Sequence, residues 1–265
     1  MITESGSGDM ELLEWDASTY DSLDLPHKRW GRDALERLSP RGDEAALEIG
    51  CGSGRDTERL LEALPHGSVV AVDGSRQMLE QLRARLGDGD GRLRALHRDL
   101  RQPFDLRGPF DAVMSVATLH WLPDHRHVFA ELARVVRPGG RLVIEGGGHR
   151  NIARFLRVLR AVHGDDGSRF WNFAGVEDTR ARLRAAGFER IAVRLVPDEA
   201  RLEDRARLEA FVATVMLAAP LRELPADRRA EFVSAVCDRL PEPAIDFVRL
   251  QIEAVRGPGL VLAGS

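Results

Sequence analysis

The sequence is short of the residues that mark several classes of protein. Two cysteines in 265 residues, Cys51 and Cys237, are too few for a disulfide framework or a cysteine-based metal cluster. The formal net charge of -4 gives no excess of basic residues for binding nucleic acid. The longest apolar stretch, residues 211–221, is too short to span a bilayer and contains a proline. We therefore expect neither a nucleic-acid partner nor a membrane partner.

The amino-terminal residues carry no targeting signal. Residues 1–9 are polar and acidic and lack the basic and apolar regions of a signal peptide. We expect residues 1–10 to be disordered and the protein to be cytoplasmic, as a monomer or a homodimer. His125 and His127 stand two residues apart, which is not the i, i+4 spacing of a helical metal pair, so we expect no metal.

The most informative stretch is a glycine-rich turn. Apolar residues at 45–49 predict a strand, the leucines of 60–64 predict a helix, and glycines stand between them at positions 50, 52 and 54. Because glycine has no Cβ, the backbone can turn sharply there and lie close against a ligand. The first N–H groups of the following helix are unpaired and point toward the same place. The stretch therefore predicts a ligand site.

Strands and helices alternate from this turn to residue 145. The pattern predicts strands at 45–49, 68–72, 92–97, 110–116 and 141–145, and helices at 55–64, 75–86 and 125–136. Such alternation is typical of parallel strands joined by right-handed crossovers, and so of an α/β fold.

The pattern changes outside this region. Residues 12–38 have helical spacing with a break near Pro26, and later helices are expected at 151–162, 177–186 and 204–240, the last divided around Pro220 and Pro225. Residues 188–196 and 247–255 predict two further strands. We divide the chain into a helical cap (11–40), a core (41–200), a helical lid (201–245) and a closing strand with its tail (246–265).

The glycine spacing and two aspartates indicate which ligand the turn holds. A nicotinamide dinucleotide site uses G-x-G-x-x-G, but here Gly54 falls one place early and Arg55 follows it. Asp73 ends the second strand, where a carboxylate can accept both ribose hydroxyls of an adenosine, although it could instead cap the next helix. Asp99 ends the third strand, where it could take the adenine amino group. The three strand ends converge on one crevice.

Residues 46–145 resemble a class I S-adenosylmethionine-dependent methyltransferase. The resemblance rests on Leu-Glu-Ile-Gly-Cys-Gly-Ser-Gly, Val-Val-Ala-Val-Asp-Gly-Ser, Arg-Asp-Leu, Phe-Asp-Ala-Val-Met-Ser and Arg-Pro-Gly-Gly-Arg-Leu-Val. Residues 20–31, 119–125 and 146–152 are similar to the trans-aconitate methyltransferase-like subgroup, which often has glutamine where His27 stands. The resemblance implies a Rossmann-like, doubly wound sheet of seven mostly parallel strands, the last antiparallel, with a helical lid.

The resemblance also implies S-adenosyl-L-methionine as the cofactor and a small-molecule acceptor as the partner. It implies cofactor contacts from eleven residues, namely Tyr20, Gly50, Gly52, Gly54, Asp73, Gly74, Ser75, Met78, Asp99, Leu100 and Ser115. In this arrangement Asp73 would bind the ribose hydroxyls and Tyr20 would close over the cofactor.

Other side chains are candidates for the acceptor side. His120 follows the fourth strand and is a candidate general base, with His27 as a second; either could equally be a packed histidine. Trp30, Trp121 and Trp171 are candidates for the substrate wall, although tryptophans beside helices are commonly packed in a core.

The expected reaction is O-methylation of a carboxylate, which is already ionised and needs no base. Methylation of carbon, a phenol or an amine in bacterial secondary metabolism is an alternative, and carbon and phenol acceptors would need a base. A cyclase that binds the cofactor without net methyl transfer is another. An NAD-dependent dehydrogenase is disfavoured by Arg55.

Overall fold

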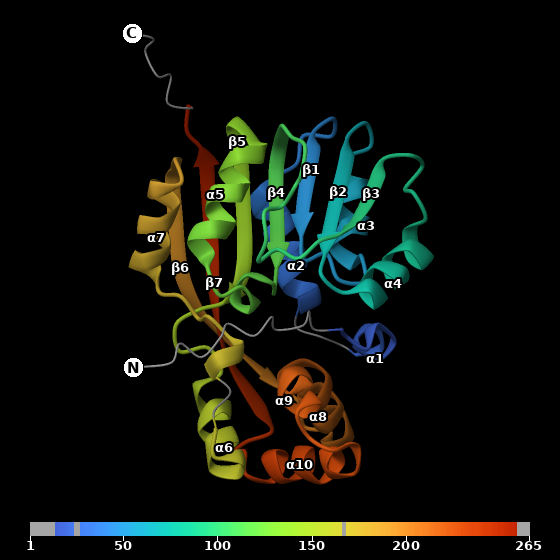
Figure 1. The fold of residues 1–265 in the computed structure, drawn as a ribbon, viewed down its shortest axis with the longest axis vertical. Helices are drawn as coiled ribbons and strands as arrows, with labels where there is room; N and C mark the ends of the chain where they lie inside the picture. The colour runs from blue at the N-terminus through green and yellow to red at the C-terminus, as the bar shows by residue number, and fades with distance from the viewer. Residues whose placement is uncertain (1–13, 24–26, 166–167, 259–265) are drawn as a thin grey trace, which may run out of the picture.

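A computed structural model describes residues 14–23, 27–165 and 168–258 (Figure 1). Seven strands form one sheet in the order β3-β2-β1-β4-β5-β7-β6. Their bounds are β1 (Ala45–Ile49), β2 (Ser68–Asp73), β3 (Leu93–His97), β4 (Phe110–Val116), β5 (Val136–Gly147), β6 (Phe188–Arg201) and β7 (Ala244–Arg256). The first five strands in this order, β3, β2, β1, β4 and β5, pair in parallel. Strand β7 is antiparallel to both β5 and β6. The prediction of a mostly parallel, seven-stranded sheet with an antiparallel last strand is confirmed.

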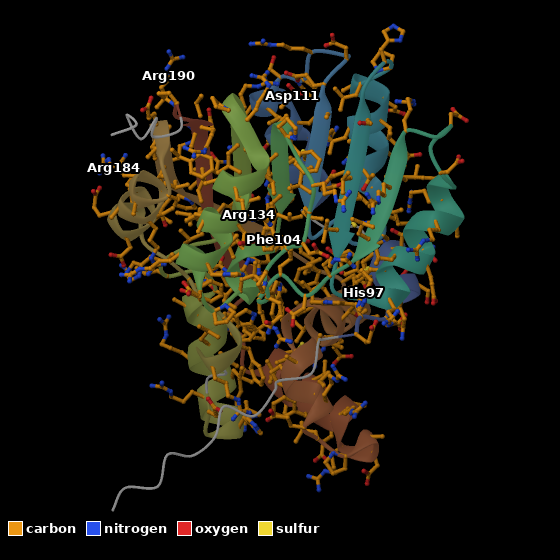
Figure 2. The ribbon with its side chains drawn as sticks, turned by 45° about the horizontal axis from the view of Figure 1, so that its top comes forward. His97, Phe104, Asp111, Arg134, Arg184 and Arg190 are labelled. Atoms are coloured by element: carbon orange, nitrogen blue, oxygen red, sulfur yellow. The ribbon has the colours of Figure 1, made fainter. Side chains whose placement is uncertain are left out.

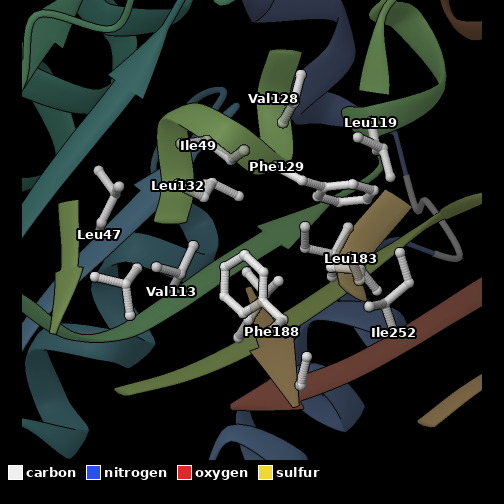
Figure 3. Close-up of a cluster of buried hydrophobic side chains, with 14 of the residues drawn as sticks. Leu47, Ile49, Val113, Leu119, Val128, Phe129, Leu132, Leu183, Phe188 and Ile252 are labelled. Atoms are coloured by element: carbon white, nitrogen blue, oxygen red, sulfur yellow. The ribbon is translucent and has the colours of Figure 1, made fainter. Parts of the chain in front are cut away.

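Helices cover both faces of this sheet. Their bounds are α1 (Ala17–Ser22), α2 (His27–Leu38), α3 (Arg55–Ala63), α4 (Arg76–Leu86), η1 (Leu119–Trp121), α5 (His125–Val135), α6 (Ala153–His163), η2 (Ser168–Phe170), α7 (Val176–Ala185), α8 (Arg205–Phe211), η3 (Val212–Met216), α9 (Ala218–Arg222) and α10 (Ala226–Asp238). Helices α5 and α7 pack on one face of the sheet, where Phe129, Leu183 and Phe188 form part of a fully buried cluster (Figure 3). Helices α2, α3 and α4 pack on the other face.

A lobe of helices lies beyond the carboxyl ends of the parallel strands (Figure 1). It contains α6, α8, α9 and α10, and β6 and β7 extend into it. Phe155 of α6 packs in one cluster with Phe211 of α8 and Val236 of α10. Helix α6, which the sequence places within the range 41–200 of the core, therefore shares its core with the helices of residues 201–245. We call these four helices and the π-helical turn η3 the helical lobe.

The lobe faces the carboxyl ends of the parallel strands. Asp111 at the start of β4 lies at the far edge of the sheet, and His97 at the end of β3 lies toward the lobe (Figure 2). Strand order reverses between β1 and β4, so their connections leave in opposite directions and open a crevice at this edge. Among the described residues, no helix is both long and apolar enough to cross a membrane.

The lobe departs in detail from the helical pattern of residues 204–240. The pattern predicts two pieces, and the structure has α8, η3, α9 and α10 there. Pro220 lies inside α9, close enough to its start that the missing N–H breaks no helical bond. One break falls at Leu217, whose N–H donates to the oxygen of Val212 at 2.8 Å. A second break falls at residues 223–225, where the pattern predicts it, and Pro225 is the N-cap of α10. Strand β6 also runs five residues beyond its expected end at 196, to Arg201, because β7 pairs with it along that length.

Glu48 of β1 is a buried acid behind the glycine turn. Its side chain is 3% exposed, and the hydroxyl of Thr57 donates to Oε2 at 2.6 Å. Burial raises the pKa of Glu48 well above its usual range, and the negative charge of Asp56 adds to this. The folded protein therefore keeps this proton at pH values where the unfolded chain has lost it, so stability falls as pH rises above about 4.5.

We expect Glu48→Gln to remove this pH-dependent loss. The amide keeps an oxygen that can accept from Thr57 and never ionises. The difference in unfolding free energy between the variant and the parent should be smallest near pH 4 and grow to on the order of 1 kcal/mol near pH 8. Denaturant unfolding at several pH values measures it, with the exposed Glu62→Gln as the matched control. Equal pH responses of the two variants would contradict the prediction.

Candidate functional site

One cavity of about 610 Å³ lies between the carboxyl ends of the strands and the helical lobe. It receives residues from the amino-terminal segment, from the loops after β1 to β5, and from the lobe. The wall includes thirteen residues that the sequence singles out, namely Tyr20, Trp30, Gly50, Gly52, Asp73, Gly74, Ser75, Met78, Asp99, Leu100, His120, Trp121 and Trp171. The fold thus brings these distant positions together at one place.

Glycine is required at two positions of the turn for different reasons. At Gly50, φ is +71° and a Cβ would lie 1.8 Å from Oγ1 of Thr118, so the loops after β1 and β4 can meet only if this residue has no side chain. At Gly52, φ is +52° and the nearest atom to a Cβ would be Sδ of Met78, 4.0 Å away. The backbone at Gly52 therefore borders open cavity.

Asp73 connects the glycine turn to the loop after β2. Its two carboxylate oxygens accept from the N–H groups of Gly52 and Ser75, each at 2.8 Å. Burial raises the pKa of Asp73, and these two bonds oppose the shift. The side chain that caps α4 is that of Ser75, which accepts from the N–H of Met78. The alternative that Asp73 serves as that cap is therefore wrong.

Asp99 lies on the cavity wall but already has a partner. Nε of Arg101 donates to Oδ1 at 2.9 Å, and Nη2 donates to Oδ2 at 2.8 Å. Burial alone would raise the pKa of Asp99, but the bonds from Arg101 lower it. Leu100, 5% exposed, presents an apolar side chain beside this pair. The wall at the end of β3 is thus apolar with one charge-balanced polar group.

Three expected site residues are not on the described wall. Gly54 begins α3 with φ of +86°, and a Cβ there would lie 2.8 Å from Cγ of Leu82, so its glycine serves helix packing. Ser115 is fully buried in β4, and its hydroxyl donates to the oxygen of Ile49 at 2.9 Å. The side chain of His27 lies outside the described part of the structure.

Two carboxylates hold the amino-terminal segment over the cavity. Oε2 of Glu14 accepts from the hydroxyl of Ser75 at 2.8 Å, at the start of α4. Asp21 of α1 accepts from the hydroxyl of Ser53 at 2.8 Å and forms ion pairs with Arg55 at 2.8 Å and Arg85 at 2.5 Å. We call the Asp21 group the Asp21 clasp. Arg55, at the position that a dinucleotide fingerprint gives to glycine, is part of it.

His120 is held in one orientation on the wall. Its Nδ1 accepts from the N–H of Gly147 at 3.1 Å, and its ring stacks on Phe173 with centroids 5.8 Å apart. Because a backbone amide can only donate, Nδ1 carries no proton in this arrangement. The proton of the neutral imidazole is therefore on Nε2, and the ring offers a donor there.

Arg249 brings a positive charge to the wall that carboxylates balance. It is 7% exposed and pairs with the fully buried Glu145 of β5. Its Nε lies 3.1 Å from Oδ2 of Asp198, close enough for ion pairing although too poorly aligned for a hydrogen bond. Trp30 packs against the guanidinium, 5.5 Å from the ring centroid, and donates to the same Asp198 oxygen at 2.6 Å.

The cavity also has residues that sequence reasoning did not assign to a site. Trp15, Thr118 and Asn151 line it from the amino-terminal segment, the β4 loop and the β5 loop, and Met216 and Arg222 line it from the lobe. Trp15 had a signal, since residues 12–38 are rich in aromatics for this chain. The lobe residues had no such signal, because a helical pattern indicates which face of a helix is apolar but not which part of the protein packs against that face. Within the described chain, no three His, Cys, Asp or Glu side chains gather to hold a metal ion.

The sequence of this chain is similar to those of known proteins. Residues 46–140 match a family described as a methyltransferase domain. A trans-aconitate 2-methyltransferase of Azoarcus sp. (strain BH72) is 34% identical over 131 residues, which cover 49% of this chain and 50% of that protein. The chain thus spans about half the length of the curated relatives it matches.

Solved structures share the fold at low sequence identity. The YcgJ protein from a Bacillus species is 14% identical with a TM-score of 0.61, over 87% of this chain and 99% of that one. Phosphoethanolamine N-methyltransferase 2 of Haemonchus contortus, in complex with phosphomonomethylethanolamine and S-adenosylhomocysteine, is 18% identical with a TM-score of 0.60. That match covers 87% of this chain and 53% of the other.

The Asp21 clasp should set how often α1 opens from the rest of the protein. Asp21→Asn removes the negative charge that pairs with Arg55 and Arg85, so α1 should open more often. Amide exchange in residues 14–23 should accelerate about 5- to 30-fold, equivalent to about 1–2 kcal/mol for a network of partly buried pairs. Hydrogen exchange by mass spectrometry measures this.

Asp16→Asn is the matched control, because it makes the same charge change on the same segment. Asn caps a helix about as well as Asp, and Asp16 makes its bonds to Thr19 and Ser18 rather than to the glycine turn. Equal acceleration in the two variants would show that the clasp does not hold α1.

Proposed function

We propose that this chain, in which residues 46–140 form a class I S-adenosylmethionine-dependent methyltransferase domain, transfers a methyl group to the carboxylate of a small molecule. The relatives named trans-aconitate 2-methyltransferase support a carboxylate acceptor. The observation that carries the proposal is the orientation of His120, which presents a donor and not a base.

The residues on the wall fit the cofactor S-adenosyl-L-methionine. Asp73 is a carboxylate with lone pairs to spare beyond its two backbone bonds, as binding of ribose hydroxyls requires. The open space at Gly52 lets a ligand lie against the backbone. Met78 and Leu100 offer apolar surface for the adenine, next to Asp99. When bound, the cofactor supplies an electrophilic methyl group on a sulfonium.

Positioning is the main contribution that this chain makes to the reaction. The leaving group of a bound cofactor would be a neutral thioether, so no residue of this chain has to supply a proton. Alignment of the acceptor oxygen with the methyl group can provide up to about 7–11 kcal/mol of the barrier. The helical lobe and the clasped amino-terminal segment both border the site, which reduces its contact with water.

The wall offers no prepared base for an unionised acceptor. The described carboxylates are Asp73, bonded to two backbone N–H groups, Asp99, paired with Arg101, and Glu223, paired with Arg169. A phenol or a carbon acid would need one of these or His120 to take its proton. A carboxylate needs none, and Nε2 of His120 can donate to one of its oxygens. This favours the carboxylate over the phenol and carbon alternatives.

Asp73→Ala tests the cofactor site. Loss of a charged acceptor of two hydroxyl bonds should weaken binding of S-adenosylhomocysteine about 10- to 100-fold, from about 1.5–3 kcal/mol per charged hydrogen bond. Isothermal calorimetry measures the affinity, and the exposed Asp88→Ala makes the same charge change away from the cavity. Unchanged affinity in Asp73→Ala would show that the cofactor does not bind at Asp73.

The pH dependence of methyl transfer tests the role of His120. With a carboxylate acceptor, kcat/KM should not rise with pH from about pH 6 to 9, because the acceptor is already ionised and no base has to lose a proton first. His120→Ala should lose about 10- to 100-fold, the value of a hydrogen bond to a charged group. His120→Gln, whose amide can donate from the place of Nε2, should recover most of that loss.

The exposed His66→Ala serves as the control and should leave kcat/KM unchanged. A rate that climbs tenfold with pH and collapses in both the Ala and Gln variants would make His120 a base. The acceptor would then be an alcohol, a phenol or a carbon acid.

A further inference from the structure

The aromatic residues of this chain are concentrated in one place. The sequence has four tryptophans and one tyrosine in 265 residues. All five lie on the wall of the cavity, together with three phenylalanines: Trp15, Tyr20, Trp30, Trp121, Trp171, Phe170, Phe173 and Phe247. They come from the amino-terminal segment, α2, η1, the loop around η2 and β7. Residues that are far apart in the sequence therefore lie together in the fold.

Four of these rings form a continuous surface that passes His120. Trp15 meets Trp121 with centroids 5.4 Å apart, and Trp121 meets Trp171 at 5.8 Å. Trp171 stacks on Phe173 at 6.1 Å with 9° between the planes, and Phe173 stacks on His120. The aromatic surface therefore begins beside the donor that the proposed function assigns to the acceptor carboxylate.

This surface is incompletely buried by the fold. Trp15, Trp121, Trp171 and Phe173 are all half-buried, whereas core rings such as Phe129 are fully buried. Rings that line a cavity and remain partly exposed have apolar area that a ligand can cover. Each Å² of apolar area removed from water contributes about 25 cal/mol, so such a surface favours an apolar ligand over water.

The helical lobe adds further apolar residues to the wall of the cavity. Val215 and Met216 of η3 and Ala219 of α9 lie on the wall. Val215 and Met216 are buried at 9% and 4% exposure, so they form a fixed, water-excluding face. Phe173 of the aromatic surface packs against the cluster that contains Val215 and Met216, so apolar area continues from the rings to the lobe.

Two of the four arginines on the described wall, Arg249 and Arg101, have close carboxylate partners. Arg249 is balanced by Glu145 and Asp198, and Arg101 by Asp99. A tricarboxylate carries about three negative charges, and burying an unpaired charge costs several kcal/mol. Arg98 lies 4.0 Å from the exposed Asp105, and Arg222 lines the cavity from α9. The aromatic surface itself presents one polar group, His120, beside which a single methylated carboxylate can lie.

We infer that the acceptor is a monocarboxylic acid with a large apolar body, an aryl-substituted or long-chain acid, and not a short polycarboxylate. The inference rests on the proposed function, because the group methylated is the carboxylate. The body lies along Phe173, Trp171 and Trp121, and the carboxylate lies at His120.

A panel of acids tests this with labelled S-adenosylmethionine. For straight-chain acids of about four to ten carbons, kcat/KM should rise about fourfold per methylene, the equivalent of about 0.8 kcal/mol each. Arylalkanoic acids should match the longer members, and a short tricarboxylate should react at least about 100-fold more slowly than these.

Variants of Trp171 locate the effect. Trp171→Ala should lower kcat/KM about 10- to 100-fold for the longest acid, since a fully buried aromatic contributes about 1.5–3 kcal/mol, and less than twofold for the shortest. Trp171→Phe should recover much of the loss. Phe232→Ala, an aromatic of α10 that packs against His163 away from the cavity, is the control and should not change the chain-length dependence.

Quenching of tryptophan fluorescence by the acids, with S-adenosylhomocysteine present, gives a second measurement that needs no turnover. Affinity should rise with chain length in the parent, and less steeply in Trp171→Ala. Equal rates for the tricarboxylate and the long acids, with no effect of Trp171→Ala, would overturn the inference and leave the proposed function standing. Labelling of an amine or a phenol from the same panel, with no acid labelled, would overturn the proposed function itself.

Discussion

The close approach of two loops at Gly50 is the constraint on which the site depends. A Cβ at this position would overlap the hydroxyl of Thr118, so the loops after β1 and β4 can meet only over a bare backbone. Their meeting at the reversal of strand order places the turn at the mouth of the crevice. Asp73 then fixes the turn by accepting from Gly52, and the Asp21 clasp fixes the amino-terminal segment above it.

The acceptor side depends on a different kind of contact. Glu145 of β5 pairs with Arg37 of α2 and with Arg249 of β7, and Arg249 pairs in turn with Asp198 of β6. Buried ion pairs contribute little net stability, but they fix the elements that carry them relative to one another. Here they connect α2 to β5 and to the two strands that extend into the lobe, β6 and β7, so these elements keep fixed positions around the cavity.

The cofactor half was predictable because it is local. The glycine turn, Asp73 and Asp99 each follow a strand, and parallel strands bring their ends to one edge whatever lies around them. Trp171, which follows η2, is different: its packing on Phe173 and Trp121 depends on how residues 168–175 lie against η1. The tautomer of His120 in η1 depends in the same way on the N–H of Gly147, which lies at the end of β5.

The sequence by itself determined the sheet, its parallel pairing and the ligand turn. Those features follow from apolar periodicity and from where glycine and aspartate stand relative to each strand. Only the tertiary structure decided that Ser75 and not Asp73 caps α4, that Gly54 and Ser115 lie off the described cavity wall, and that α6 shares a core with the lobe. It alone brought all the tryptophans to one wall, because contacts between segments more than a hundred residues apart leave no periodic trace along the chain.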